Sequence, residues 1–256
     1  MAPAFKIVIP ARYGSSRLPS KPLLPIAGRP MIAHVCDRAL LAGADQVVVA
    51  TDDHRIVEAV SGLAVTAMLT SPDHHSGTER IAEVTEKLGW DDRTLIVNLQ
   101  GDEPLMRPDL IRQLAQALAS QAQCEVATLA APIRDRAEVF NPNAVKVVLD
   151  RTGNALYFSR APIPWHRDSF AVEGAVLPDG VPYLRHIGIY AYSAGFLRRY
   201  TRWPASPLES VESLEQLRIL WMGERIFVLP VEKAPEAGVD TEDDLARVRR
   251  MLAEVE

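Results

Sequence analysis

Cysteine is scarce in this sequence, and long apolar runs are absent from it. The 256 residues include only Cys36 and Cys124, both in apolar surroundings, so we expect neither a disulfide framework nor a zinc cluster and interpret both as reduced core thiols. No run of about 18 apolar residues occurs, so no transmembrane helix is expected. The segment Met1–Lys6 lacks the apolar stretch of a signal peptide. The simplest prediction is a cytoplasmic protein without a membrane partner.

A strong excess of charge is also absent. The formal net charge is -5, so a nucleic-acid backbone is not an expected partner, although local basic groups suffice for one small anion. The composition is 48% hydrophobic and 24% charged, which is ordinary for a globular protein with a sizeable core. The length allows one large α/β domain, or a core domain with a modest insertion.

The first half of the sequence alternates between apolar runs of strand length and amphipathic stretches of helix length. This order predicts a mostly parallel sheet with helices on both faces. Ligands of such sheets lie beyond the carboxyl ends of the strands, which points to the loops Pro10–Gly28, Leu69–Ser76 and Gln100–Met106. The expected strands are Phe5–Ile9, Gln46–Ala50, Val65–Leu69 and Thr94–Leu99, and the expected helices include Pro30–Ala42, Asp53–Ser61 and Pro108–Ser120.

The pattern changes after Val126, where strands follow one another with little helix between them. We expect these strands to be partly antiparallel, either extending the sheet or forming a smaller lobe at about 126–192 for substrate binding or dimerisation, within one domain of residues 1–256. Arg160–Leu184 is rich in Pro, Gly, Asp and Arg and is either a functional flap or a variable surface loop. The later expected elements are the strands Val126–Ala131, Val145–Leu149, Ala155–Ser159, His186–Tyr192 and Ile226–Pro230, and the helices Leu214–Met222 and Thr241–Val255, the last capped by Thr241.

The loop after the first strand, Pro10–Leu23, combines three cations, three serines and a glycine. Small residues let backbone N–H groups approach an anion, and cations neutralise it. The loop lacks the Gly-Lys-Ser/Thr ending of a Walker A loop and is not a Gly-x-Gly-x-x-Gly fingerprint. From spacing alone, a phosphate site and a solvated basic loop stay equally open.

Acidic residues offer a second candidate site. Asp102 follows the expected strand Thr94–Leu99, where a carboxylate is well placed for Mg²⁺ that also touches substrate phosphates. Asp102 is equally well interpreted as a loop-opening residue that caps the next helix. Asp240 is either the residue before a helix cap or a second metal ligand. The adjacent His74 and His75 are not expected to bind metal, because neighbouring loop histidines usually point apart.

Two further positions have mainly structural interpretations. His186, alone at the start of a strand, is more typical of a satisfied structural histidine than of a ligand. The segment Ser76-Gly77-Thr78-Glu79 matches a capping box at the start of a helix.

Nine segments, in order and in spacing, resemble the 3-deoxy-manno-octulosonate (Kdo) cytidylyltransferase family over about Phe5 to Arg249. Mild departures are Gly14-Ser15 and Ser20 in the first loop, and Phe170–Pro182 matches no family pattern. The segments are Ile9-Pro10-Ala11-Arg12-Tyr13, Arg17-Leu18-Pro19-x-Lys21-Pro22-Leu23, Ser76-Gly77-Thr78-Glu79-Arg80, Gln100-Gly101-Asp102-Glu103-Pro104, Phe140-Asn141-Pro142-Asn143-x-Val145-Lys146-Val147, Ala155-Leu156-Tyr157-Phe158-Ser159-Arg160, Arg185-His186-x-Gly188-Ile189-Tyr190, Leu214-Glu215-Gln216-Leu217-Arg218 and Gly238-Val239-Asp240-Thr241.

The resemblance implies a Rossmann-like nucleotidyltransferase fold and transfer of CMP from CTP to Kdo, giving CMP-Kdo and pyrophosphate for lipopolysaccharide biosynthesis. It also implies a magnesium cofactor and a homodimer. The catalytic positions it implies are Arg12, Lys21, Asp102 and Asp240, the two aspartates being the metal ligands.

The resemblance further assigns the binding positions for the two substrates. Around the nucleotide it implies Arg12, Lys21, Ser76, Gly77, Arg80 and Gln100. Around the sugar it implies Gln100, Arg160, His186, Tyr190, Glu215 and Gln216.

Two alternatives remain open at this stage. A related enzyme acting on another acid sugar, 8-amino-Kdo or more remotely a sialic acid, would carry the same phosphate and metal segments. A non-catalytic nucleotide-binding module on the same fold is the alternative of another class.

Overall fold

The structure is a computed structural model that describes residues 3–14, 18–172, 176–178 and 180–253. Its described residues divide into two compact units. The first unit comprises Met1–Ser120, Ile189–Thr201 and Pro235–Glu256, and the second comprises Gln121–Gly188 and Arg202–Ala234. The expected lobe at about 126–192 and its roles in substrate binding and dimerisation stay a prediction.

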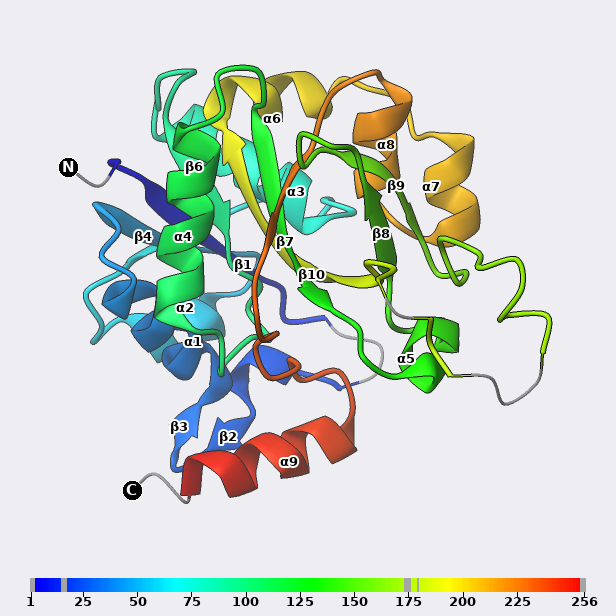
Figure 1. Cartoon of the computed structure of the whole chain (residues 1–256). Helices are drawn as coiled ribbons and strands as arrows, with labels where there is room; N and C mark the ends of the chain where they lie inside the picture. The colour runs from blue at the N-terminus through cyan, green and yellow to red at the C-terminus, as the bar shows by residue number, and fades with distance from the viewer. Residues whose placement is uncertain (1–2, 15–17, 173–175, 179, 254–256) are drawn as a thin grey trace. The chain divides into compact units, whose positions relative to one another are not determined.

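The first unit alternates strands and helices in the order expected from the sequence (Figure 1). Its strands are β1 (Lys6–Ala11), β2 (Pro25–Ile26), β3 (Arg29–Pro30), β4 (Gln46–Thr51), β5 (Thr66–Leu69), β6 (Leu95–Asn98) and the second half of β10 (Leu184–Ser193). Its helices are the 3₁₀ turn η1 (Lys21–Leu23), α1 (Met31–Leu41), α2 (His54–Val60), α3 (Gly77–Lys87), α4 (Pro108–Ala119), α6 (Ala194–Tyr200) and α9 (Glu242–Ala253).

Four strands of this unit are parallel neighbours in the order β6, β1, β4 and β5. The strand β10 pairs antiparallel with β6, with Tyr190 opposite Asn98. The helix α4 lies on one face of the sheet and α3 on the other (Figure 1), as expected for strands with few exposed residues. The prediction of a mostly parallel α/β sheet is therefore confirmed.

One strand boundary corrects the prediction. The sequence pattern placed the end of the first strand at Pro10, but β1 continues to Ala11 and pairs Pro10 with Ala50 of β4. Proline is tolerated there because β6 pairs with β1 only over Lys6–Val8, so the missing N–H of Pro10 is not needed by a ladder on that side.

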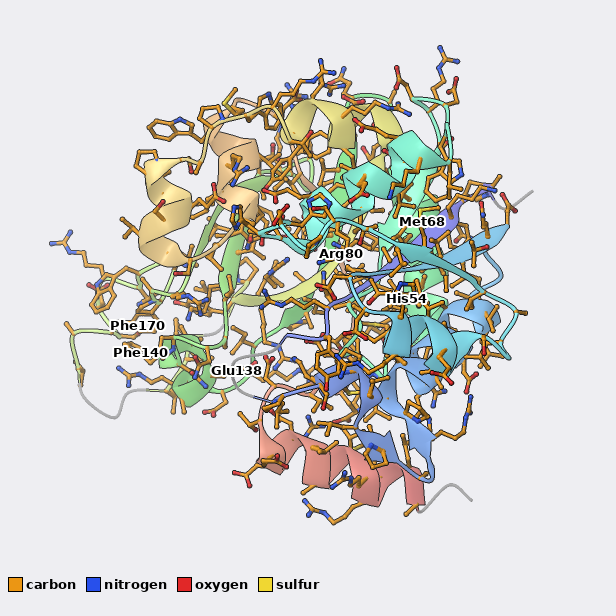
Figure 2. The ribbon with its side chains drawn as sticks, turned by 180° about the vertical axis from the view of Figure 1, so that it is seen from behind. His54, Met68, Arg80, Glu138, Phe140 and Phe170 are labelled. Atoms are coloured by element: carbon orange, nitrogen blue, oxygen red, sulfur yellow. The ribbon has the colours of Figure 1, made fainter. Side chains whose placement is uncertain are left out.

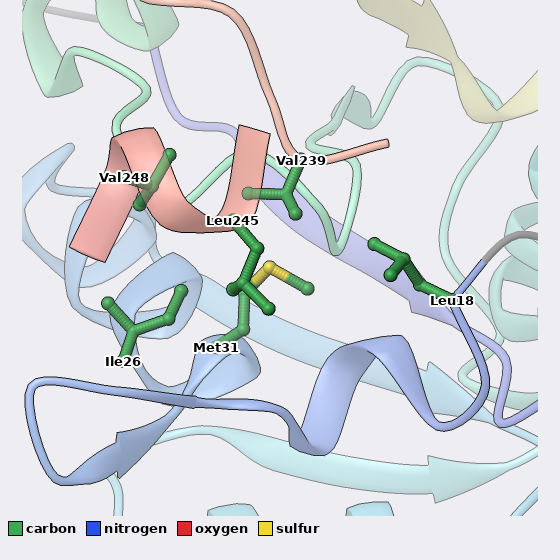
Figure 3. Close-up of a cluster of buried hydrophobic side chains, with 6 residues drawn as sticks. All are labelled: Leu18, Ile26, Met31, Val239, Leu245 and Val248. Atoms are coloured by element: carbon green, nitrogen blue, oxygen red, sulfur yellow. The ribbon is translucent and has the colours of Figure 1, made fainter. Parts of the chain in front are cut away.

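The C-terminal helix α9 is fastened to the first loop of the chain by a buried apolar cluster. Figure 3 shows its six side chains. They come from the segment before η1, the β2–β3 hairpin, α1, the segment before α9 and α9 itself, and are Leu18, Ile26, Met31, Val239, Leu245 and Val248. Val239 directly precedes Asp240, so this packing fixes the backbone on which Asp240 stands. Thr241 accepts a hydrogen bond from the Asp244 N–H through Oγ1, as expected for the helix cap.

The second unit contains shorter elements. Its strands are β7 (Val126–Pro132), β8 (Lys146–Leu149), β9 (Ala155–Ser159), the first half of β10 and β11 (Phe227–Pro230), and its helices are α5 (Arg136–Phe140), α7 (Pro207–Glu212) and α8 (Gln216–Trp221). β11 pairs with β7 in parallel, whereas β8 pairs antiparallel with both β9 and β10. The partly antiparallel pairing expected after Val126 is confirmed.

The segment after Arg160 has no helix or strand among its described residues before β10. Its Phe170 is buried against Ile133, Val139 and Tyr183, and its ring centroid lies 5.0 Å from that of Phe140. Figure 2 labels Phe140 and Phe170. These contacts pack the described part of the segment onto the second unit.

Among the described helices, none is long and apolar enough to cross a membrane. Cys36 and Cys124 are both free thiols, but only Cys36 is buried. The expectation of a core thiol is wrong for Cys124, which is half-buried and donates to Asn154 Oδ1.

Candidate active site

Lys21 joins the two aspartates that the resemblance marks as metal ligands. Its Nζ donates to Asp102 Oδ2 at 2.6 Å, to Asp240 Oδ1 at 3.0 Å and to the Val239 carbonyl oxygen at 2.9 Å. An ammonium group has three N–H donors, so all three are engaged. The fold thus brings together, in the first unit, residues separated by 81 and 219 positions along the chain.

Three carboxylates gather around this lysine. Burial lowers the pKa of Lys21, but the charges and hydrogen bonds of Asp102 and Asp240 outweigh it, so the pKa is raised overall. Burial, followed by the charges of Asp102 and Asp240, raises the pKa of Glu103 to about 8. Glu103 is therefore mostly protonated at neutral pH, which avoids a third negative charge beside the other two.

Glycines allow the loops of this site to approach one another closely. A Cβ on Gly101 would lie 2.9 Å from the Pro10 carbonyl oxygen, and one on Gly238 would lie 2.8 Å from the Asp102 carbonyl oxygen. Both distances are shorter than real Cβ contacts, so larger residues would push the loops apart. The backbone N–H of Val239 also donates to the Asp102 carbonyl oxygen at 2.9 Å, which connects the segments that carry Asp102 and Asp240.

The predicted nucleotide residues on α3 form a second part of the site. Arg80, labelled in Figure 2, is buried at 3% exposure and donates to Thr70 Oγ1 and to Asp52 Oδ2. The other carboxylate oxygen of Asp52 accepts from the Tyr13 backbone N–H at 3.1 Å. Asp52 therefore connects Arg80 to the first loop. This residue was missed from the sequence, although it follows a parallel strand at its carboxyl end.

Gly77 and Gln100 are neighbours. A Cβ on Gly77 would lie 3.3 Å from Pro10 Cγ and 3.5 Å from Gln100 Nε2. Gln100 Nε2 donates to Asn98 Oδ1 at 2.9 Å, and Asn98 faces Tyr190 in the β6–β10 register. The structure thus groups Gly77, Gln100 and Tyr190 around the carboxyl ends of β1 and β6.

The start of α3 departs from the expected capping box. Ser76 Oγ accepts from the Glu79 N–H, as predicted, but the Glu79 carboxylate accepts from the His75 N–H instead of from the cap residue itself. His74 lies beside Glu83, with Nε2 at 2.5 Å from Oε2. Among the described residues, no group of three or more His, Cys, Asp or Glu side chains is arranged to hold a metal ion.

The first loop is only partly described. Arg12 is exposed, and Ser15–Arg17 lie outside the described residues, so the interpretation of three serines and three cations is tested only in part. Ser20 adopts a left-handed backbone with φ of 54° immediately before η1, and it turns the chain so that Lys21 faces Asp102.

Arg160, a predicted sugar residue of the second unit, is held by several hydrogen bonds to backbone carbonyl oxygens. Arg160 donates from Nε to the Glu212 carbonyl oxygen at 2.7 Å and from Nη1 to the Pro142 carbonyl oxygen at 2.9 Å. A longer contact of 3.5 Å joins Nη2 to the Ser213 carbonyl oxygen. Since guanidinium has five N–H donors, one N–H on each terminal nitrogen is left for a ligand.

His186 sits where its ring is protected from protonation. Burial lowers the pKa of His186 to about 3, and its ring packs edge-on against Phe158 at 5.0 Å. Nε2 lies 3.0 Å from Thr128 Oγ1, which itself donates to the Ile187 carbonyl oxygen. A neutral His186 offers hydrogen bonding but no positive charge to an acid sugar.

The remaining sugar positions differ in exposure. Gln216 is buried at 8% exposure, and its Nε2 has no hydrogen-bond partner among the described residues. A buried amide N–H is costly to leave unsatisfied. Glu215, the residue before it, is exposed, and Tyr190 in the first unit is buried and stacks on Tyr192 at 5.6 Å.

Comparisons with known proteins identify the family. A family model described as cytidylyltransferase matches residues 6–226. A protein of Methylococcus capsulatus named 3-deoxy-manno-octulosonate cytidylyltransferase is 65% identical over 97% of this chain and 97% of its own length. The chain belongs to the 3-deoxy-manno-octulosonate cytidylyltransferase family. The expected nucleotidyltransferase class is thereby confirmed.

Two further members of this family agree with that assignment. The cytidylyltransferase of the same name from Idiomarina loihiensis is 56% identical over 98% of this chain and 99% of its own length. A solved structure titled as CMP:2-keto-3-deoxy-manno-octonic acid synthetase complexed with CTP superposes with a TM-score of 0.89. It is 45% identical and covers 99% of this chain and 100% of that one.

One acid of this cytidylyltransferase site was not assigned a role from the sequence. Glu103 lies next to Asp102 and touches the Gly238 position, so it belongs to the same cluster. Its adjacency to Asp102 was visible in the sequence, but its neutral state depends on burial and on Asp240, which only the fold supplies.

Proposed function

We propose that this chain transfers CMP from CTP to Kdo, giving CMP-Kdo and pyrophosphate for lipopolysaccharide biosynthesis. The observation that carries the proposal is the contact of Lys21 with both Asp102 and Asp240 beside the first loop. It places one cation and two carboxylates at the edge of the sheet where ligands of parallel α/β folds bind. The names of the relatives and the CTP complex of the similar structure support the choice of substrates.

The nucleotide is proposed to occupy the carboxyl ends of β1 and β6. Arg12, which is exposed, and Lys21 would contact the triphosphate. Ser76 and Gly77 at the start of α3 would lie around the cytosine or its ribose, with Arg80 and Gln100 beside them. Arg80 is buried and donates to Thr70 and Asp52, and Asp52 also binds the first loop. Arg80 would therefore support the nucleotide site by positioning α3 and the first loop.

Magnesium fits the donors of this site. Asp102 and Asp240 present carboxylate oxygens to one positively charged atom, Lys21 Nζ, so their position already suits a cation. Mg²⁺ in phosphate-transferring sites is commonly bound by one or two carboxylates together with substrate phosphates. Asp102 and Asp240 would hold it, and it would supply charge neutralisation at the phosphate and lower the pKa of a bound hydroxyl.

The chemistry requires no protein nucleophile. The anomeric hydroxyl oxygen of Kdo forms a bond to the α-phosphorus of CTP, the bond from that phosphorus to the bridging oxygen breaks, and the hydroxyl proton passes to solvent. Both reactants are anions, so positioning and charge neutralisation dominate the barrier. Arg12 and Lys21 would stabilise the departing pyrophosphate, and no covalent enzyme intermediate is expected.

The sugar is proposed to contact Arg160, His186, Tyr190, Glu215 and Gln216, with Gln100 as a further contact. Arg160 retains one N–H on each terminal nitrogen, which suits a carboxylate. The unsatisfied amide nitrogen of Gln216 is a ready donor for a sugar hydroxyl. Neutral His186 would contribute a hydrogen bond and leave the charge to Arg160.

The proposal includes a homodimer in the cytoplasm. The second unit carries exposed apolar side chains on β9, α7 and α8, with Leu156 at 62%, Val211 at 84% and Trp221 at 55% exposure. Apolar surface of this kind is typical of protein contacts. Free thiols at Cys36 and Cys124 suit a reducing compartment. Sedimentation equilibrium should give twice the mass of the chain, and a monomer at all concentrations would contradict the dimer.

The test of the function is pyrophosphate release from CTP with Mg²⁺ and a panel of acid sugars. Kdo is expected to support turnover, and replacing CTP by UTP should reduce it strongly. Failure of pyrophosphate release with CTP and Kdo would contradict the proposal. Preferential turnover of 8-amino-Kdo or a sialic acid would keep the transferase chemistry and reassign the sugar.

A further inference from the structure

Lys146 is a fully buried cation to which the proposed chemistry gives no role. It lies in the segment Asn141-Pro142-Asn143-Ala144-Val145-Lys146-Val147, where the family resemblance is strong, and its exposure is 0%. Charged residues are almost never fully buried unless they are paired. A buried lysine at this position therefore needs a physical explanation.

Backbone carbonyl groups surround the ammonium of Lys146. Nζ donates to the carbonyl oxygens of Asn141 at 2.9 Å, Ala144 at 2.6 Å and Arg160 at 2.6 Å. All three N–H donors are thus used, each on a different peptide group. Burial lowers the pKa of Lys146, with Glu212 acting in the opposite direction. The three carbonyl groups replace the water that burial removes.

The ammonium of Lys146 and the carboxylate of Glu212 together bind both backbone polar groups of Arg160. The carbonyl oxygen of Arg160 accepts from Lys146, and the backbone N–H of Arg160 donates to Glu212 Oε2 at 2.9 Å. The guanidinium of Arg160 returns to the same turn, donating to the Pro142 carbonyl oxygen at 2.9 Å. Lys146 and Arg160 each bind the backbone of the other's segment, and β8 and β9 support this by pairing Lys146 with Ser159.

We propose that Lys146 is a positioning residue for the acid sugar, acting through Arg160. The inference rests on the proposed function, in which Arg160 binds the sugar carboxylate. With its carbonyl oxygen held by Lys146 and its N–H held by Glu212, the Arg160 backbone has both polar groups restrained. That restraint aims the remaining guanidinium N–H groups.

The chemistry of the three acceptors explains why a lysine is used. Three carbonyl oxygens converging on one point match the compact, three-donor ammonium, whereas a guanidinium is a planar fork that fits them poorly. A neutral side chain would remove the ammonium donor from the Ala144 and Arg160 carbonyl oxygens, whereas the Asn141 oxygen would keep the Ala144 N–H at 3.1 Å. The Arg160 peptide would then turn toward another donor, and the guanidinium would lose its direction.

The decisive experiment compares Lys146→Met with the exposed Lys233→Met of the same unit. For Lys146→Met, we expect the KM for Kdo to rise about 10-fold while the Kd for CTP, measured calorimetrically, changes less than about twofold. Lys233→Met should change neither. Circular dichroism and a thermal melt establish that each variant is folded before its kinetics are compared.

An unchanged KM for Kdo in folded Lys146→Met would overturn the inference. Equal losses in Kdo and CTP binding would overturn it as well, because they indicate general damage. If Lys146→Met does not fold, Lys146→Arg decides, since it keeps the charge but mismatches the three carbonyls. A raised KM for Kdo with an unchanged Kd for CTP supports positioning, and an unchanged KM removes it.

The failure of this inference is distinct from failure of the proposed function. If the unaltered protein releases no pyrophosphate from CTP and Kdo, the proposed function fails before any variant is made. If the unaltered protein turns over Kdo and Lys146→Met behaves like Lys233→Met, only the role of Lys146 is rejected.

Discussion

At the residue scale, Lys21 shows how one side chain organises a charged site. Its ammonium donates all three N–H groups, to Asp102, to Asp240 and to the Val239 carbonyl oxygen. For Lys21 to contact the triphosphate as proposed, a phosphate oxygen would have to replace one of these acceptors. A metal ion at the two aspartates would release Lys21 for that exchange, because it would take over the neutralisation of both carboxylates.

Replacing Lys21 tests its role with the triphosphate. Lys21→Ala should weaken CTP binding by about 10-fold or more, because a charge-assisted contact is worth roughly 1.5–3 kcal/mol. Kdo binding should survive. Isothermal titration with CTP measures the effect, and Lys6→Ala is the control, since Lys6 forms only a surface pair with Asp45 at 3.7 Å. Unchanged CTP binding and turnover would return the first loop to a solvated basic segment.

The two aspartates give a second residue-scale prediction. Asp102→Asn and Asp240→Asn should each lower kcat by about 10²-fold or more with the fold intact, the size typical of losing a key electrostatic contact. Asp243→Asn, an exposed position on α9, is the matched control. Steady-state pyrophosphate release measures all three. Near-normal activity in either of the first two variants would remove that residue from the metal site.

At the scale of elements, loops are held by the helices that follow them. Glu83 on α3 accepts from the Ser71 N–H at 2.9 Å and pairs with His74, and Lys87, one turn later, donates to the Leu69 carbonyl oxygen at 2.9 Å. The loop between β5 and α3 is therefore tied back along its own helix. The His74 side chain takes part in this restraint through its contact with Glu83.

The strand β10 gives a prediction about pH, through His186. The pKa of His186 is about 3 in the folded protein, below the ordinary value of 6.5. Between these two pH values the unfolded chain binds a proton at His186 that the native state does not. The native contribution is present above pH 6.5 and is lost as the pH falls toward 3, by about 1.4 kcal/mol per pH unit at most. Stability should therefore fall on acidification.

The measurement is urea unfolding at pH 7 and pH 5 for the unaltered protein and for His186→Gln. Glutamine keeps a donor for Thr128 but cannot titrate, so the variant should lose less of its unfolding free energy between these values, by about 2 kcal/mol at most. Identical pH dependence in the two proteins would show that His186 takes up a proton as readily in the folded protein as in the unfolded chain, and would contradict the prediction.

At the scale of the molecule, the two units carry different parts of the assigned chemistry. Arg12, Lys21, Asp102 and Asp240 belong to the first unit, whereas Arg160, His186 and Gln216 belong to the second. Mutation of Arg160, His186 or Gln216 should therefore raise the KM for Kdo with little effect on CTP. Gln100 and Tyr190, also proposed as sugar contacts, lie in the first unit, and a change at Gln100 should affect both substrates.

Metal removal is the prediction for the molecule as a whole. EDTA should abolish pyrophosphate release, and added Mg²⁺ should restore it, because two anionic reactants need a divalent charge between them. The control is the circular dichroism spectrum, which should not change, since the apolar cluster around Leu245 holds α9 without a metal. Turnover that persists in chelator would contradict the metal mechanism.

Much of the first unit follows from local patterns. The alternating order of strands and helices is predicted by buried runs such as Val47-Val48-Val49 and by the helical spacing on α3. Both patterns are visible in the sequence without knowledge of distant contacts. Short elements were missed, among them α6, α7 and the β2–β3 hairpin. Their two to seven residues carry too little periodicity, and contacts from distant segments stabilise them.

The candidate site divides in the same way. The sequence by itself determined the family, through nine segments in order, and the residue types available at each loop. Only the tertiary structure decided that Lys21 meets Asp102 and Asp240, that burial beside these carboxylates raises the pKa of Glu103, and that Lys146 holds Arg160. Hydrogen bonds and charges act over a few ångströms of space, and chain separations of many residues carry no information about those distances until the sheet has formed.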